Sequence, residues 1–241
     1  DPGFCQDHAI RYPYGGGAMA KGISSVAMVE ALAKAGMLGF FGAAGLLIEE
    51  VEAAIDRLQA AIPGHPYGFN LIHSPNEPEL ENALVDLYLR RKITLVEASA
   101  FLDLTPALVR YRTHNISRDQ DGNVITPNRI IAKISREEVA AKFLAPPPER
   151  FLQELVASGQ LTAEQAEMAA EVPMAQDVTV EADSGGHTDN RPALALFPTI
   201  LAQKNACQNE YGYAQTLRVG LGGGIATPAS AAAACAPGAA S

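Results

Sequence analysis

The hydrophobic positions along the chain alternate between a helical period and short continuous runs. Ile48, Val51, Ile55, Leu58 and Ile62 follow one another at spacings of 3, 4, 3 and 4 residues. This spacing predicts the buried face of an amphipathic helix, because residues three and four apart share a helix face. The runs between such segments are short and mostly apolar, which predicts buried strands. The predicted strands cover residues 37–41, 67–72, 93–99, 129–135, 177–182 and 216–221.

A helix-forming segment follows each predicted strand, and one more precedes the first. That leading segment can be capped by Ser24 or Ser25, and it ends at Gly36, since glycine most easily adopts a left-handed C-cap. The segment over residues 191–204 contains Pro198, and we expect the helix to break there because proline lacks a backbone N–H. The predicted helices cover residues 26–35, 48–62, 78–91, 105–113, 136–144 and 191–204, with a last one beginning at residue 227.

Strands that alternate with helices at this spacing predict βαβ units and a parallel sheet. With a short first strand near residues 11–15, about seven units are present in 241 residues. An eight-unit barrel typically needs about 250 residues. We therefore predict an α/β fold of the (β/α)8 TIM-barrel type, truncated before the eighth strand, as a single domain over residues 1–241. An open, doubly wound parallel sheet is the alternative.

Two segments depart from the simple alternation. Residues 114–128 are polar and indicate a small hairpin that turns at Asp121-Gly122. Residues 145–176, after the fifth strand and its helix, are too long for a plain connection. They predict an inserted pair of helices, with Thr162 and Gln165 as a capping box.

Composition narrows the class of protein. The net charge is −9, which argues against nucleic acid as a partner, because phosphate binding needs a basic surface. No apolar run reaches the ~18 residues that a membrane span requires. There is no signal-peptide pattern, and Cys5, Cys207 and Cys235 are isolated from one another, so we expect a reduced, cytoplasmic protein without a metal site.

Candidate chemistry gathers where the predicted strands end, which is where barrel enzymes carry their active sites. Gly222, Gly223 and Gly224 join a strand to a helix start, an arrangement that suits a phosphate group, although a tight turn explains them equally well. Lys133 and Asn70 interrupt apolar strands. Each either contacts a ligand or is accommodated structurally, the lysine by extending to solvent and the asparagine by hydrogen bonds in the core.

His187 follows a Gly-Gly pair directly after a strand, so its ring can donate a proton or a hydrogen bond near neutral pH. A lone histidine is more often structural or exposed. No second histidine or cysteine stands at metal-ligand spacing from it, and no GxSxG motif is present.

Six segments together resemble one enzyme group, namely "GGGAMAKGISS", "AKAGMLGFFGAAG", "YGFNLIHSP", "IIAKIS", "EADSGGHTDNRP" and "RVGLGGGIATP". They occur in register from about residue 11 to residue 230 and resemble the FMN-dependent enoyl reductases and nitronate monooxygenases that share a (β/α)8 barrel. The resemblance is strongest to the enoyl reductase subunit of bacterial polyunsaturated fatty acid synthases and to the enoyl reductases that act in trans on polyketide synthases.

The resemblance implies bound FMN and assigns roles to particular residues. Gly17, Ala18 and Met19 are implied to lie beside the isoalloxazine ring, with Asn70 and Lys133 at its polar edge. His187 matches the family's active-site histidine, near the carbonyl group of the substrate. The remaining cofactor-binding residues are Asp183, Ser184, Gly185 and Gly186 along the flavin and ribityl chain, and Gly222, Gly223 and Gly224 at the phosphate.

The implied activity is reduction of the 2,3 double bond of an enoyl thioester carried on acyl carrier protein, with NADPH or NADH as reductant. Acyl carrier protein domains are the implied partners, and a homodimer is compatible with the resemblance. Three alternatives stay open: a nitronate monooxygenase-type flavin oxidase, a non-catalytic scaffold subunit of a synthase, and a barrel that binds a sugar phosphate without redox chemistry.

Overall fold

The structure is a computed structural model that describes residues 1–182 and 189–241. The chain divides into two compact units. Unit 1 comprises Asp1–Ser99 with Ala240–Ser241, and unit 2 comprises Ala100–Ala239. The single domain over residues 1–241 stays a prediction.

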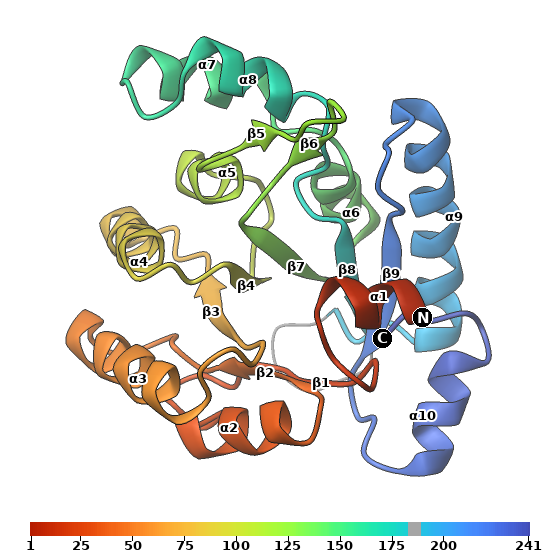
Figure 1. Cartoon of the computed structure of the whole chain (residues 1–241). Helices are drawn as coiled ribbons and strands as arrows, with labels where there is room; N and C mark the ends of the chain where they lie inside the picture. The colour runs from red at the N-terminus through yellow and green to blue at the C-terminus, as the bar shows by residue number, and fades with distance from the viewer. Residues whose placement is uncertain (183–188) are drawn as a thin grey trace. The chain divides into compact units, whose positions relative to one another are not determined.

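Unit 1 is a parallel sheet whose strands follow the order β1-β2-β3-β4, with helices α2, α3 and α4 along it (Figure 1). Side chains of the two middle strands are almost completely buried, so the sheet forms the core of this unit. Its elements are α1 (Pro2–Asp7), β1 (Gly15–Gly16), α2 (Val26–Lys34), β2 (Leu38–Phe41), α3 (Ile48–Ala61), β3 (Gly68–Ile72), α4 (Pro78–Arg90) and β4 (Leu95–Ser99).

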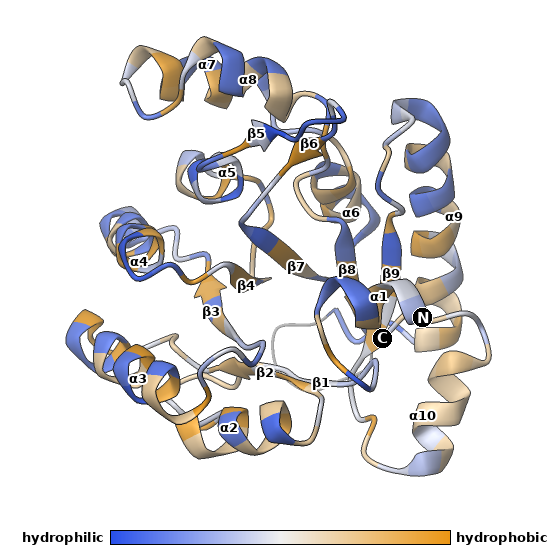
Figure 2. Cartoon of the chain, viewed as in Figure 1, coloured by the Kyte–Doolittle hydropathy of each residue, from blue (hydrophilic) through white to orange (hydrophobic). Residues whose placement is uncertain are grey.

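The local signals in unit 1 act as the sequence indicates. The Ser25 side chain accepts a hydrogen bond from the Met28 N–H and so caps α2, and Gly36 after the helix has φ of +77°. On α3 the apolar stripe is buried while acidic residues face outward, and hydrophobic and hydrophilic residues alternate around this helix and α4 (Figure 2). Burial of this stripe positions the loops that precede and follow the strands.

Unit 2 contains three parallel strands in the order β7-β8-β9, with helices α6 and α9 packed beside them (Figure 1). The expected hairpin at Asp121-Gly122 is present as an antiparallel pair. The elements are α5 (Pro106–Thr113), β5 (Ser117–Arg118), β6 (Val124–Ile125), β7 (Arg129–Ile134), α6 (Glu137–Leu144), α7 (Glu149–Ala157), α8 (Ala163–Ala169), β8 (Asp177–Glu181), α9 (Ala193–Tyr211), β9 (Arg218–Gly222) and α10 (Pro228–Cys235).

The predicted insertion consists of α7 and α8, and both helices contact α5. The capping box is formed as predicted: the Thr162 hydroxyl accepts a hydrogen bond from the Gln165 N–H, and the Gln165 side chain accepts one from the Thr162 N–H. Leu152 and Leu155 of α7 are buried. Within unit 2, the insertion therefore forms a helical layer that packs on α5.

Buried charges hold the amino ends of the strands in unit 2 together. Asp177 and Arg218 are register partners on β8 and β9, and their side chains form hydrogen bonds of 2.6 and 3.1 Å. Nearby, Arg112 donates to the carbonyl groups of Pro173 and Asn128 at 3.0 and 2.7 Å. Burial, and secondarily the positive charge of Arg129, lowers the pKa of Arg112 to about 10.

Two sequence predictions need correction, and one helix was not predicted. Helix α9 is not broken at Pro198 but runs continuously from Ala193 to Tyr211. Pro198 is the sixth residue of this helix, and the one backbone hydrogen bond that it removes is the bond to the carbonyl of Leu194. The first strand is shorter and later than expected, at Gly15–Gly16, and α1 was not predicted.

Candidate active site

Asn70 lies on β3 with an amide group of fixed orientation. Its Nδ2 group donates to the Glu97 carbonyl at 3.2 Å and to the Ser99 hydroxyl at 2.9 Å, while its own backbone carbonyl accepts from the Tyr88 hydroxyl at 2.7 Å. Within the described residues, Asn70 Oδ1 accepts no hydrogen bond. The protein thus uses both amide donors and leaves the acceptor oxygen for a ligand that carries an N–H or O–H group.

The loop of Gly17, Ala18 and Met19 after β1 is held by a fully buried serine. The Ser24 hydroxyl donates to the Gly17 carbonyl and accepts from the Met19 N–H, both at 2.8 Å. The segment is also tied to the end of β2, because the Gly42 N–H donates to the Ser24 carbonyl at 3.0 Å. This loop is therefore preorganised by hydrogen bonds within unit 1.

Glu97 connects this loop with Asn70, and sequence reasoning missed it. It is the register partner of Asn70 on β4, so the two side chains share a face of the sheet. Its Oε2 atom accepts a hydrogen bond of 2.8 Å from the Ala18 N–H, and the residue is 5% exposed. The signal was an acidic residue inside the apolar run "ITLVEAS", which is the kind of interruption that identified Asn70.

Lys133 in unit 2 has the anionic partner that a lysine within a strand requires. Its Nζ atom lies 2.7 Å from Glu181 Oε1, and both side chains are largely buried. Lys133 pairs in register with Thr179, two residues before Glu181 on β8, so the three side chains lie on one face of the sheet. The charge at this position belongs to an ion pair and not to an isolated cation.

The glycines after β9 form an open backbone segment. Gly223 and Gly224 have φ of +112° and +66°, and a Cβ atom at Gly224 would meet no other atom within 4 Å. At the start of α10, however, a capping box between Thr227 and Ser230 uses the backbone N–H groups of both residues. A phosphate group at this end would therefore be held by the glycine backbone more than by the helix terminus.

The catalytic histidine predicted from the sequence, together with four predicted cofactor-binding residues, lies outside the described residues. These are His187, Asp183, Ser184, Gly185 and Gly186.

The chain directly after residues 183–188 is fastened to the start of α6. Asp189 accepts two hydrogen bonds from Arg136, at 2.8 and 2.9 Å, and one of 2.9 Å from the Ser135 hydroxyl. Arg191 and Glu137 form a second bidentate pair at 2.7 and 2.8 Å. These arginines hold the pKa values of the Asp189 and Glu137 carboxyl groups below their usual range. Both pairs are thus ionised at neutral pH and are lost as the pH falls through those lowered values.

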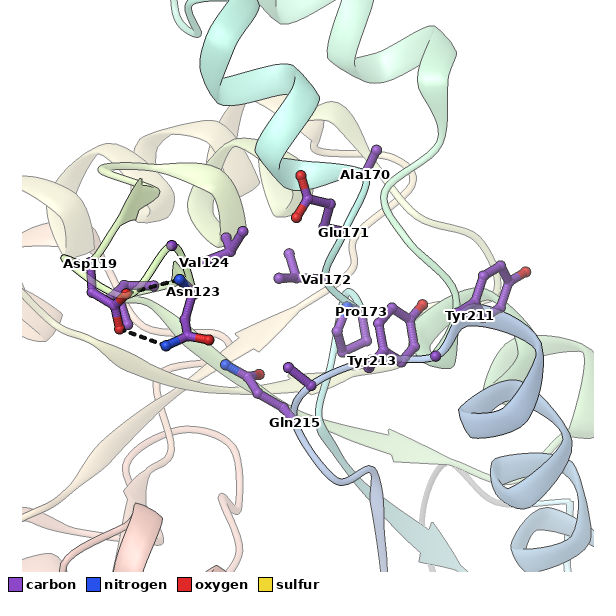
Figure 3. A pocket seen from close by; sticks show the side chains of 14 residues that line it. Asp119, Asn123, Val124, Ala170, Glu171, Val172, Pro173, Tyr211, Tyr213 and Gln215 are labelled. Carbon is purple, nitrogen blue, oxygen red and sulfur yellow. Dashed lines mark hydrogen bonds between the residues drawn. The ribbon is translucent and has the colours of Figure 1, made fainter.

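A cavity of about 720 Å³ lies at the opposite edge of the sheet in unit 2. Its lining residues precede β7, β8 and β9, whereas Lys133 and Glu181 stand at the carboxyl ends. Figure 3 shows Asp119 and Asn123 on one side of it and Pro173 with Tyr213 on the other. Amino-terminal edges of this architecture serve stability, so we assign it no role in the chemistry.

No group of three or more His, Cys, Asp or Glu residues in the described part of the chain is placed to hold a metal ion. Over the same residues, every helix is too short or too polar to cross a membrane.

Comparison with known proteins gives no matching family model but several homologues. One of them, which belongs to the polyunsaturated fatty acid synthase of Thraustochytrium, is 51% identical over 242 residues, which cover 100% of this chain and 16% of that relative. The polyketide biosynthesis protein PksE of Bacillus subtilis is 48% identical over 96% of this chain and 30% of its own length. The chain thus spans less than a third of each of these relatives, and the resemblance to the two synthase systems is confirmed.

Among solved structures, the enoyl reductase domain of MlnA, from the macrolactin cluster of Bacillus amyloliquefaciens, has a TM-score of 0.96 at 41% identity. The match covers 100% of this chain and 54% of that chain. It confirms the α/β, TIM-barrel-type fold predicted from the sequence. A nitroalkane oxidase of Streptomyces ansochromogenes shares the fold alone, with a TM-score of 0.60 at 17% identity over 98% of this chain and 65% of its own.

Proposed function

We propose that the chain is an FMN-dependent enoyl reductase that reduces the 2,3 double bond of enoyl thioesters on acyl carrier protein, with NADPH or NADH as reductant. The observation that carries the proposal is the oriented amide of Asn70 beside the fixed loop at Gly17–Met19. The 41% identity to an enoyl reductase domain over the whole chain supports the reductase chemistry. The oxidase alternative rests on a likeness of fold alone.

The residues present fit FMN by the chemistry of their groups. The free Oδ1 atom of Asn70 suits the imide N–H of an isoalloxazine ring, and the Gly222–Gly224 backbone suits a phosphate. The Lys133 ammonium, paired with Glu181, would hydrogen-bond a ring oxygen without adding a full net charge. When bound, FMN would supply the two-electron transfer between the nicotinamide and the enoyl thioester.

His187 is proposed to donate a hydrogen bond to the thioester carbonyl of the substrate as negative charge develops on its oxygen. This role is what the resemblance of the segment "EADSGGHTDNRP" implies for the histidine that follows Gly185 and Gly186. It concerns the acyl substrate and not the nicotinamide. The two half-reactions therefore respond differently to loss of the imidazole ring.

Replacement of His187 by alanine is expected to slow reoxidation of the reduced protein by an enoyl thioester by about 100-fold, a range typical for loss of one such donor. Reduction by NADPH is expected to change by less than about threefold, since a threefold change is ~0.65 kcal/mol. Anaerobic stopped-flow spectroscopy measures both steps in one protein. Equal slowing of the two steps would remove His187 from the role proposed here.

The reductase and oxidase alternatives separate in one assay. We expect consumption of NADPH that depends on a trans-2-enoyl thioester attached to acyl carrier protein, and no oxygen uptake when a nitroalkane is supplied. Oxygen uptake with the nitroalkane, without any NADPH requirement, would support the oxidase instead. Folded protein that carries out neither reaction would favour the scaffold alternative.

A further inference from the structure

Glu97 is a buried carboxylate whose position is difficult to explain by stability alone. A carboxyl group that leaves water loses several kcal/mol of hydration, and an apolar residue of similar volume often serves a strand as well or better. The other residues of β4 and the neighbouring positions of β3 are apolar or small, apart from Asn70 and Ser99. We therefore ask which neighbouring groups the Glu97 side chain contacts.

The carboxylate of Glu97 lies against one peptide group of the loop. Oε2 accepts the Ala18 N–H at 2.8 Å, and a Cβ atom added to Gly17 would lie 3.2 Å from Oε1. On the other side of the same loop, Ser24 holds the Gly17 carbonyl and the Met19 N–H. Between them, the two side chains fix three consecutive residues, and Glu97 is the one that orients the Gly17–Ala18 peptide.

The same residue also orients Asn70. The Glu97 backbone carbonyl accepts one of the two amide hydrogens of Asn70, which turns Oδ1 away from the protein donors. One residue of β4 thus touches both groups of unit 1 that we propose for the flavin ring, the loop through its side chain and the amide through its backbone. Side-chain replacements at this position affect the first contact directly.

We infer that Glu97 is a positioning residue of the flavin site: its side-chain oxygen, and not its charge, holds the Gly17–Met19 loop in the conformation that receives the isoalloxazine ring. This inference rests on the proposed function. The inference requires a hydrogen-bond acceptor 2.8 Å from the Ala18 N–H. It does not require that this acceptor carry a negative charge.

Three variants of the intact protein test this requirement. E97Q keeps an acceptor oxygen at the same distance and loses the charge. E97D keeps the charge and withdraws the oxygens by one C–C bond, about 1.5 Å, which breaks a hydrogen bond of this length. E97A removes both. E81A is the matched control, because Glu81 is an equally buried acid of unit 1 that instead bonds His73 at 2.9 Å.

The readouts are FMN affinity of the apoprotein, by quenching of flavin fluorescence, and thermal unfolding without FMN. We expect the dissociation constant to stay within about threefold for E97Q and E81A, and to rise about tenfold or more for E97D and E97A, corresponding to ~1.4 kcal/mol. If E97A does not fold, the FMN affinity of E97D decides whether the position of the acceptor oxygen matters.

Tight binding by E97D with weak binding by E97Q would overturn the inference in favour of an electrostatic role. Unchanged binding in all Glu97 variants would also overturn it, while leaving the proposed function intact. If the wild-type apoprotein binds no FMN, the proposed function fails and this inference fails with it.

Discussion

Replacement of Gly42 by alanine is expected to weaken the FMN binding that we propose at least 100-fold while leaving most of the fold in place. A Cβ atom on Gly42 would lie 1.7 Å from the carbonyl oxygen of Met19 and 2.7 Å from its carbonyl carbon. Both are backbone atoms, so no side chain can rotate to make room. The Gly17–Met19 loop would have to move away from the hydrogen bonds that Ser24 makes with it.

The expected losses of stability and of FMN affinity follow from this displacement of the loop. Overpacking of this kind typically costs about 1–3 kcal/mol of stability. Misplacement of the loop is expected to weaken FMN binding at least 100-fold, or ~2.7 kcal/mol at about 1.4 kcal/mol for each factor of ten. Titration of the apoprotein with FMN measures the change, and circular dichroism reports whether the fold persists.

Gly15 supplies the matched control in the same unit. A Cβ atom there would lie 3.6 Å from the Leu38 carbonyl oxygen, an ordinary contact, and the residue needs no left-handed backbone. The Gly15 variant is therefore expected to bind FMN like the wild type. Wild-type affinity in a folded Gly42 variant would show that the Gly17–Met19 loop does not contact the flavin.

Replacement of Arg218 by alanine is expected to cost about 3–5 kcal/mol of unfolding free energy, because it leaves the Asp177 carboxylate buried without its hydrogen-bonded guanidinium group. Arg218 and Asp177 are 6% and 5% exposed, and they lie at the amino ends of adjacent strands. Urea unfolding followed by circular dichroism measures the loss. The change acts on the edge of the sheet opposite the proposed chemistry, so the folded fraction should retain its activity.

Two further variants separate the effect of burial on unfolding free energy from the effect of charge pairing. Arg118 forms an ion pair with Glu171 at the exposed hairpin, and its replacement by alanine should cost less than about 1 kcal/mol. Replacement of both Asp177 and Arg218 by leucine should recover most of the loss, since a buried pair and an apolar pair of similar volume are often equivalent. A loss below about 1 kcal/mol for the Arg218 variant would contradict the burial that the structure gives this pair.

The fold could be predicted from the sequence because the patterns that determine its strands and helices are local. Alternating apolar runs and helical stripes predicted seven parallel strands, and the capping box at Thr162 and Gln165 was found from its spacing alone. The helix was wrongly predicted to break at Pro198 because the sequence does not show that Leu196, Phe197 and Ile200, on both sides of the proline, are buried in the core. The proline removes one backbone hydrogen bond, and the packing of these side chains keeps the helix continuous across it.

The candidate site was predicted in part. Asn70 and Lys133 were found because each interrupts an apolar strand, and Glu97 carries the same signal but was passed over. The pairing of Glu181 with Lys133 depends on the register of β7 and β8, which the sequence does not give. The anchoring of Asp189 and Arg191 to the start of α6 is a tertiary contact of the same kind.

The most direct test of the account is the visible absorption spectrum of the purified protein under anaerobic conditions, first alone, then with NADPH, and then with a trans-2-enoyl thioester on acyl carrier protein. We expect an oxidised flavin spectrum that NADPH bleaches and that the enoyl thioester restores. Folded protein that binds no flavin, or a bleached spectrum that the enoyl thioester leaves unchanged, would contradict the proposal that this chain is an FMN-dependent enoyl reductase.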